Sequence, residues 1–320
     1  LMLASTIVKA YRWSLLVRQS HMDVSFRRLL GSYLVGAFFS TVLPTSVGGD
    51  AVRAVDTAAK TRRVADSTSS VLLERAIGLI TVMGAGSIFA LFMEPGKVSP
   101  IFILMVHAMS LAGLIGLVFL RQGWFMDPIA ALLTRLKLAM VVKRVKSLQA
   151  AFSEHLESPL ILLAMFVLSI IANALTMGAT YLVLTAVTDK HIPVEAFVPM
   201  IALATTAELV PISPAALGVK ESAYVFFLGM IGVPNTAAGV IAIIMRVLVW
   251  ALALLGGIVF MLRTISARSE DEPPPDQQPP GERHSKPVPV DSSSELAMDS
   301  LIEVPAIAIP APVIAPAAGD

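Results

Sequence analysis

The sequence contains no cysteine. Disulfide bonds, thiolate nucleophiles and cysteine metal sites are therefore excluded, although this absence does not fix the compartment. No metal-ligand spacing, P-loop, dinucleotide fingerprint or nucleophile elbow is found along the chain either. We therefore expect no catalytic residue, no metal ligand and no cofactor, and we predict that the protein is not an enzyme.

Charge is also scarce. Only 15% of the 320 residues are Asp, Glu, Lys or Arg, whereas a soluble domain carries about 25%. Hydrophobic residues make up 56% of the chain, and the net charge of +1 argues against nucleic acid as a partner. The protein therefore has too little polar surface to fold as an ordinary water-soluble domain.

Several long stretches carry no charged residue at all. About 18 to 20 apolar residues are needed for a helix to cross the roughly 30 Å hydrocarbon core of a bilayer. The runs that reach or approach this length are Leu29–Gly49, Ala76–Met93, Val98–Leu120 and Pro159–Thr188, followed by the runs on either side of Arg246. These runs predict an all-α, polytopic transmembrane helix bundle.

The two ends of the chain differ from this central part. Residue 1 is Leu, and Leu1–Val17 already carries Lys9 and Arg12, so we expect a truncated helix whose upstream helix or helices are missing. Eleven of the 21 prolines fall between Asp271 and Asp320, among polar residues and alanine. Such a composition favours disorder. We therefore divide the chain into a transmembrane domain, 1–262, and a disordered tail, 263–320.

Basic residues predict the orientation of the helices. They are concentrated in 50–75 and in 121–157, the two intervals that flank the paired runs Ala76–Met93 and Val98–Leu120. By the positive-inside rule both intervals are cytoplasmic loops of a protein in the cytoplasmic, or inner, membrane, and the tail is expected on the same side. Mixed three- and four-residue spacing of apolar residues indicates that part of 121–157 is an amphipathic interfacial helix.

The uncharged run 29–49 is basic on both flanks and contains Pro44 and the pair Gly48-Gly49. If both flanks are cytoplasmic, the run enters and leaves the membrane on one side as a broken or re-entrant segment. A plain crossing with a basic outer flank is the alternative. Non-helical backbone at membrane depth is tolerated only where protein buries it or water reaches it.

A second interruption, ELVPISPAALGVKE at 208–221, has the same design of apolar run, proline, serine, glycine and charge. Two such broken segments in the two halves of a membrane protein are typical of inverted repeats with a binding site near the midplane. The residues that we expect at this cavity are Pro44, Ser46, Gly48, Gly49, Asp50, Arg53, Glu74, Arg75, Glu208, Pro211, Ser213, Gly218, Glu221 and Arg246.

Each of these charges also has a simpler interpretation. Asp50 could be the N-cap of an ordinary helix, and Glu74-Arg75 reads as an ion pair at the mouth of a span, of interest if it lies near Asp50. Arg246 lies within a long apolar stretch. A charge at that depth costs at least about 2.5–3.5 kcal/mol unless it is paired or hydrated. We therefore expect Arg246 to pair with Glu208 or Glu221.

These clusters resemble the transmembrane region of the lysylphosphatidylglycerol synthase family, a flippase-like membrane domain. The resembling segments are Arg12-Trp13, LVGAFFSTVLPTSVGGDAVRA from Leu34, VLLERAIGL from Val71, ELVPISPAALGVKESAYVFFLGMIGVP from Glu208, and Arg246 with Gly256-Gly257. They follow the family order. One departure is Pro214-Ala215-Ala216, where the family usually has a glycine pair, so the geometry of that loop is not carried over.

The resemblance implies binding or movement of polar-headed lipids in the cytoplasmic membrane. It also implies no lysyl transfer here, because the segment after Leu262 is too short for the soluble aminoacyltransferase domain of two-domain relatives. The leading hypothesis is a lipid flippase-like protein that receives a phospholipid or lipid-linked headgroup. The alternative is a non-transporting scaffold that presents lipid-linked substrates to a membrane glycosyltransferase or synthase.

Overall fold

The structure is a computed structural model that describes residues 1–43, 48–94, 96, 98–122, 134–135, 139–207 and 217–271. Contacts divide the chain into two units at Ala267 and Arg268, and the fold below is that of the first unit. The calls on Pro44, Ser46, Glu208, Pro211 and Ser213, and on nearly all of the tail, lie outside the described residues.

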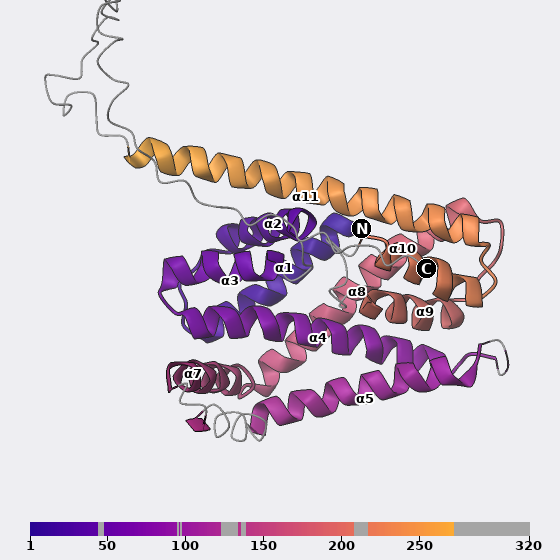
Figure 1. Cartoon of the computed structure of the whole chain (residues 1–320), viewed down its shortest axis with the longest axis horizontal. Coiled ribbons are helices and arrows are strands. Elements are labelled where there is room, and N and C mark those ends of the chain that lie inside the picture. Colours follow the sequence, from indigo (N-terminus) through magenta and orange to yellow (C-terminus); the bar gives the residue numbers. More distant parts are fainter. Residues whose placement is uncertain are drawn as a thin grey trace, which may run out of the picture. The chain divides into compact units, whose positions relative to one another are not determined.

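The described part is helical, without a strand, which confirms the all-α prediction (Figure 1). Its helices are α1 (Met2–Gln19), α2 (Phe26–Val42), α3 (Gly48–Thr61), α4 (Val64–Ala90), α5 (Pro100–Gln122), α7 (Ala139–His155), α8 (Pro159–Val187), α9 (Val194–Ala207), α10 (Val219–Met230) and α11 (Asn235–Asp271). Four of them, α4, α5, α8 and α11, are long and apolar enough to cross a membrane.

The uncharged run 29–49 does not form one continuous helix. Leu43 leaves the helical region, with φ −75° and ψ 150°, as expected for a residue that precedes proline. After the break α3 folds back antiparallel along α2, so that Ser32 lies beside Asp56 and Gly36 beside Gly49. A Cβ on Gly49 would lie only 2.0 Å from the carbonyl oxygen of Gly36. Glycine is therefore required for this close contact.

Helices α9 and α10 form a second hairpin. Ala196, at the start of α9, clusters with Met230 and Ile231 at the end of α10, so these two helices are also antiparallel. At about 1.5 Å per residue, the arms of the two hairpins are about 18–26 Å long. They are shorter than the roughly 30 Å of hydrocarbon that a crossing helix spans.

The two hairpins enter the bundle from opposite ends of α4. The open end of the first hairpin packs near the start of α4, where Leu29 clusters with Trp13 and Val71. The open end of the second packs at the other end of α4, where Ala196 clusters with Ala90 and Val98. The two tips therefore approach each other inside the bundle, with α4 running along both hairpins.

The order of elements repeats along the chain. A helix, a hairpin and a long helix occur first as α1, α2–α3 and α4, and again as α8, α9–α10 and α11. Each long helix also packs closely on the hairpin of the other half. A Cβ on Gly86 of α4 would lie 2.9 Å from the Ala202 side chain of α9, and one on Gly256 of α11 would lie 1.9 Å from the Leu34 carbonyl oxygen of α2.

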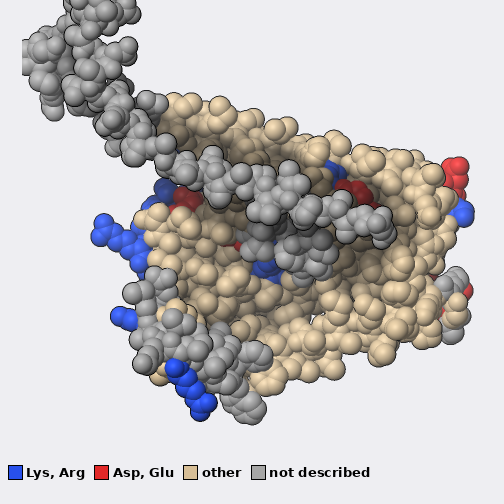
Figure 2. Space-filling model, viewed as in Figure 1, with Lys and Arg blue, Asp and Glu red and all other residues tan. Residues whose placement is uncertain are grey.

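The junction of α3 and α4 lies at the same end of the bundle as the end of α7. Ser20 lies just after α1, and its carbonyl oxygen accepts a hydrogen bond from the Arg63 guanidinium group. The Ser20 hydroxyl oxygen lies 3.0 Å from Nε2 of His155 in α7. Lys and Arg side chains gather at this end, near α3 and α7, in Figure 2. The interval 50–75 is not a loop, however, because α3 and the start of α4 occupy nearly all of it. A helix, α7, does lie within 121–157, and its placement at a membrane interface stays a prediction.

Candidate functional site

A cavity of about 390 Å³ lies where the tips of the two hairpins meet α1, α4, α8 and α11. Every one of these helices contributes to its wall. The lining residues are Lys9, Arg12, Tyr33, Gly36, Ala37, Ser40, Thr41, Asp50, Arg53, Glu74, Arg75, Gly78, Leu79, Val82, Asn173, Thr205, Lys220, Arg246, Val249 and Trp250. The cavity therefore joins the first residues of α3 and α10, which follow the two breaks in the sequence.

The lining carries a surplus of positive charge. Among its described residues are six Lys and Arg side chains and two carboxylates, Asp50 and Glu74. Glu221, which holds Arg246 at the rim, adds a third carboxylate. Because charge in a low-dielectric site attracts counter-ions strongly, the cavity favours an anionic group.

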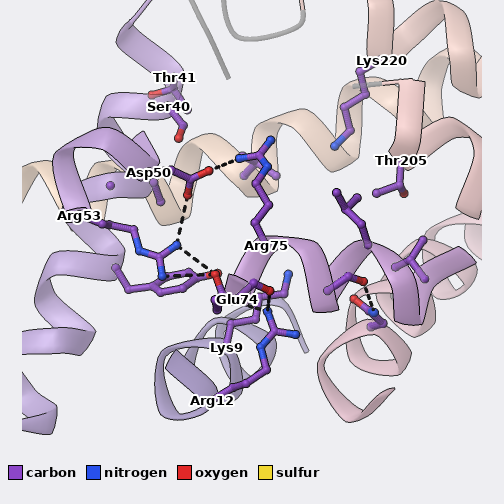
Figure 3. A pocket seen from close by; sticks show the side chains of 18 of the residues that line it. Lys9, Arg12, Ser40, Thr41, Asp50, Arg53, Glu74, Arg75, Thr205 and Lys220 are labelled. Carbon is purple, nitrogen blue, oxygen red and sulfur yellow. Dashed lines mark hydrogen bonds and ion pairs between the residues drawn. The ribbon is translucent and has the colours of Figure 1, made fainter. Parts of the chain in front are cut away.

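Glu74 is the centre of a buried network of charges (Figure 3). Its carboxylate accepts a hydrogen bond from the Arg12 guanidinium group. It also accepts two from Arg53, whose Nη1 and Nη2 lie 3.2 and 3.3 Å from Glu74 Oε2. The side chains of all three residues are at most 5% exposed. Arg12 also donates to the Glu74 carbonyl oxygen at 3.1 Å, which fixes α1 against α4.

Arg53 is held by aromatic rings as well as by carboxylates. Its guanidinium carbon lies 4.3 Å from the Trp13 ring centroid and 4.1 Å from that of Tyr33. Cation–π contacts of this kind are worth about 2 kcal/mol when desolvated. Arg53 donates to Asp50 at 3.2 Å. With Glu74 and both rings in place, we interpret Arg53 as a structural residue that positions Asp50.

Two equivalent ion pairs, which we call the tip pairs, lie at the ends of the two hairpins. They are Asp50–Arg75 and Glu221–Arg246, and 25 residues separate the partners in each. Asp50 and Glu221 are the third residues of α3 and α10, and Arg75 and Arg246 are the twelfth residues of α4 and α11.

The tip pairs occupy matching positions in the two halves of the chain. Each carboxylate lies in the first turn of its helix, where the helix dipole stabilises negative charge. In the second hairpin, Glu221 also accepts from the backbone N–H of Gly218 at 2.8 Å, and Gly218 adopts φ 83°. That left-handed conformation suits glycine.

The described residues predicted from the sequence divide into two groups. Gly49, Asp50, Arg53, Glu74 and Arg75 come together around the first tip, where Gly48 begins α3. Gly218, Glu221 and Arg246 come together around the second. The prediction that Arg246 pairs with Glu221 is confirmed.

Two of the simpler interpretations were wrong. Glu74 and Arg75 do not lie at the beginning of their helix, because α4 begins at Val64, about three turns earlier. The polar first turns of α4 are helical because their serines are buried against neighbouring helices. Ser70, for example, accepts from the Trp13 indole N–H at 3.1 Å. Asp50 is also not an N-cap, since α3 begins two residues before it.

Sequence reasoning missed several residues of the cavity. Lys9 and Arg12 were noted as charges in the first apolar stretch, and Arg12 as part of a resemblance, but neither was assigned to the cavity. Lys220 and Asn173 were not singled out. Lys9 and Arg12 lie one turn apart in a mostly apolar helix, a pattern that signals a shared polar face. Asn173 lies in a long uncharged run, where no local signal distinguishes it from a buried amide.

Comparison with protein families identifies the chain. Residues 1–257 match the family described as the lysylphosphatidylglycerol synthase TM region. The chain belongs to this family. As a member of the lysylphosphatidylglycerol synthase TM family with four candidate spans, it is a multi-pass integral membrane protein. Comparison with curated proteins and with solved structures gave no match.

Proposed function

We propose that the protein binds the anionic headgroup of a membrane lipid in the cavity and carries it from one leaflet to the other. The observation that carries this proposal is the surplus of Lys and Arg in a cavity where two hairpins from opposite ends of the bundle meet. Only the headgroup needs a polar path, because acyl chains are soluble in the bilayer. The proposal involves no covalent step, and therefore no lysyl transfer.

In this proposal the hairpins are re-entrant segments of the cytoplasmic membrane, with the basic end of the bundle on the cytoplasmic side. Their short arms place both tips at membrane depth, where broken helices serve as ion and substrate sites. Arg75 and Arg246 are the residues that meet the headgroup. Their side chains are 29% and 11% exposed, and each pairs with the carboxylate of its tip pair.

A lipid phosphate competes with those carboxylates. Asp50 and Glu221 keep the arginines oriented when the cavity is empty, and a phosphate offers the same guanidinium groups charge-assisted hydrogen bonds. Because one tip pair lies on each hairpin, a headgroup that moves through the cavity exchanges contact with Arg75 for contact with Arg246. The direction of net transport is set by the lipid gradient in this scheme.

The test is a scrambling assay in proteoliposomes that contain fluorescent phosphatidylglycerol. Arg75→Gln and Arg246→Gln should each slow transfer about 10- to 100-fold, since a charge-assisted hydrogen bond contributes about 1.5–3 kcal/mol. Arg28→Gln is the matched control, because Arg28 pairs with Asp56 outside the cavity.

Two results would count against transport. Unchanged rates in both cavity variants would remove the arginines from the path. No transfer by folded wild-type protein would instead favour the scaffold role, in which the same cavity presents a lipid-linked substrate to a glycosyltransferase or synthase partner.

A further inference from the structure

We infer that an apolar cavity between α4, α8 and α9 binds one acyl chain of the lipid whose headgroup occupies the polar cavity. The inference rests on the proposed headgroup site and adds a second subsite to it. The apolar cavity has a volume of about 360 Å³, and its lining includes Ala85, Phe89, Met177, Gly178 and Phe197. Apolar pockets of this size suit a hydrocarbon ligand.

The two cavities meet at Asn173 of α8. Asn173 lines both of them, and its amide donates to the Gly78 carbonyl oxygen at 3.1 Å and to the Thr81 hydroxyl at 3.3 Å. Along α4, Gly78 and Val82 line the polar cavity, and Ala85 and Phe89 line the apolar one. These four residues recur every three or four positions and so lie on one face of the helix. A lipid can therefore lie along this face with its headgroup at Gly78 and its chain toward Phe89.

The polar groups at the apolar cavity have partners within the protein. The Tyr181 hydroxyl donates to the Ile192 carbonyl oxygen at 2.9 Å, and the Thr81 hydroxyl donates to the Gly78 carbonyl oxygen at 3.0 Å. The wall therefore suits methylene groups better than a second headgroup. Phe89, Ile170 and Val194, also in the lining, are exposed, so the cavity opens at the surface of the bundle.

A second apolar cavity, of about 400 Å³ between α4 and α5, provides an internal control. Among the described residues, Leu79 with its hydrocarbon side chain is the one lining residue that it shares with the polar cavity. Its other α4 residues, Ala76 and Ile80, lie off the face that carries Gly78 and Val82. We therefore expect lipid there to reflect the bulk bilayer, without selection by headgroup.

Glycines allow each cavity to be filled without a clash. Gly178 lines the proposed chain site and Gly116 lines the control cavity, both within long helices. A Cβ at either position would meet no atom within 4 Å. Gly178→Phe should therefore block the chain site, whereas Gly116→Phe makes the same chemical change in the control cavity.

Occupancy of the apolar cavity between α4, α8 and α9 can be measured with a fluorophore attached at the rim of that cavity. The chain has no cysteine, so Ile170→Cys gives a single attachment point for a thiol-reactive dye. The labelled protein is reconstituted in phosphatidylcholine vesicles with a small fraction of phosphatidylglycerol whose acyl chains carry bromine, which quenches the dye on contact. Brominated phosphatidylcholine at the same fraction reports bulk lipid.

We expect brominated phosphatidylglycerol to be enriched about tenfold over brominated phosphatidylcholine at this rim, a preference of about 1.4 kcal/mol. Gly178→Phe and Arg75→Gln should each abolish the enrichment, and Gly116→Phe should leave it intact. Equal quenching by both lipids, or enrichment that survives Gly178→Phe, would overturn the chain site. Enrichment without any scrambling would preserve the chain site and refute transport, so the two proposals fail separately.

Discussion

Removing the carboxylate of Glu74 is expected to destabilise the protein severely. Glu74 is buried and is the shared partner of Arg12 and Arg53, which are also buried. Each of these arginines already has one N–H, the Nε, that finds no hydrogen-bond partner within the described part of the chain. Glu74→Ala would remove the carboxylate that the two guanidinium groups share. Among the described residues, Arg53 would keep its contacts with Asp50 and the two aromatic rings, whereas Arg12 would keep only neutral partners. Breaking a buried ion pair in this way costs about 3–5 kcal/mol.

The assay is thermal unfolding in detergent micelles. For a chain of this size each kcal/mol shifts Tm by about 2–4 °C, so Glu74→Ala should lower Tm by roughly 6–20 °C. Glu74→Gln keeps an acceptor oxygen without the charge and should give an intermediate value.

Glu221→Ala is the matched comparison for Glu74→Ala. Its side chain is 26% exposed, and ion pairs near a surface contribute about 0–1 kcal/mol. Glu221→Ala should therefore lower Tm by only a few degrees, about 0–4 °C. If Glu74→Ala unfolded at nearly the wild-type temperature, the buried network described here would not exist in the folded protein.

Two further results are expected from the packing and from the second tip pair. Gly49→Val should lower the free energy of unfolding by about 1–3 kcal/mol or more, because its Cβ would meet the Gly36 carbonyl oxygen at 2.0 Å. Gly116→Ala, at an open position within a helix, should instead raise the free energy of unfolding by about 0.5–1 kcal/mol. Equal Tm values for the two variants would argue against the first hairpin. A double-mutant cycle of Glu221→Ala and Arg246→Ala should show a coupling of about 0.5–1 kcal/mol in chemical unfolding. Strictly additive effects would mean that the pair is not formed.

The long spans were predictable because their signal is local. A helix in hydrocarbon must satisfy its backbone within itself, so uncharged runs of sufficient length reveal α5 and α8 directly. The break before α3 was also predictable, since Pro44 restricts Leu43 and glycines follow at 48 and 49. The start of α4 was not, because its serine-rich first turns read as a loop until their burial against α1 is known.

The charged site, too, was predictable from the sequence only in part. The sequence marked Asp50, Arg53, Arg75 and Arg246 as too costly to leave unpaired at membrane depth. It could not reveal that Arg53 lies between the rings of Trp13 and Tyr33, since those contacts join three helices.

Composition alone therefore determined that this is a membrane protein, and residue order alone located its two broken segments. Both conclusions follow from short-range physics, namely the insolubility of charge in hydrocarbon and the restriction of the backbone by proline and glycine. Only the tertiary structure decided that the first turns of α3 and α10 meet in one positively charged cavity with an apolar cavity beside it. That result depends on the packing of eight helices, and contacts such as Ser5 with Ala172 join residues far apart in the chain.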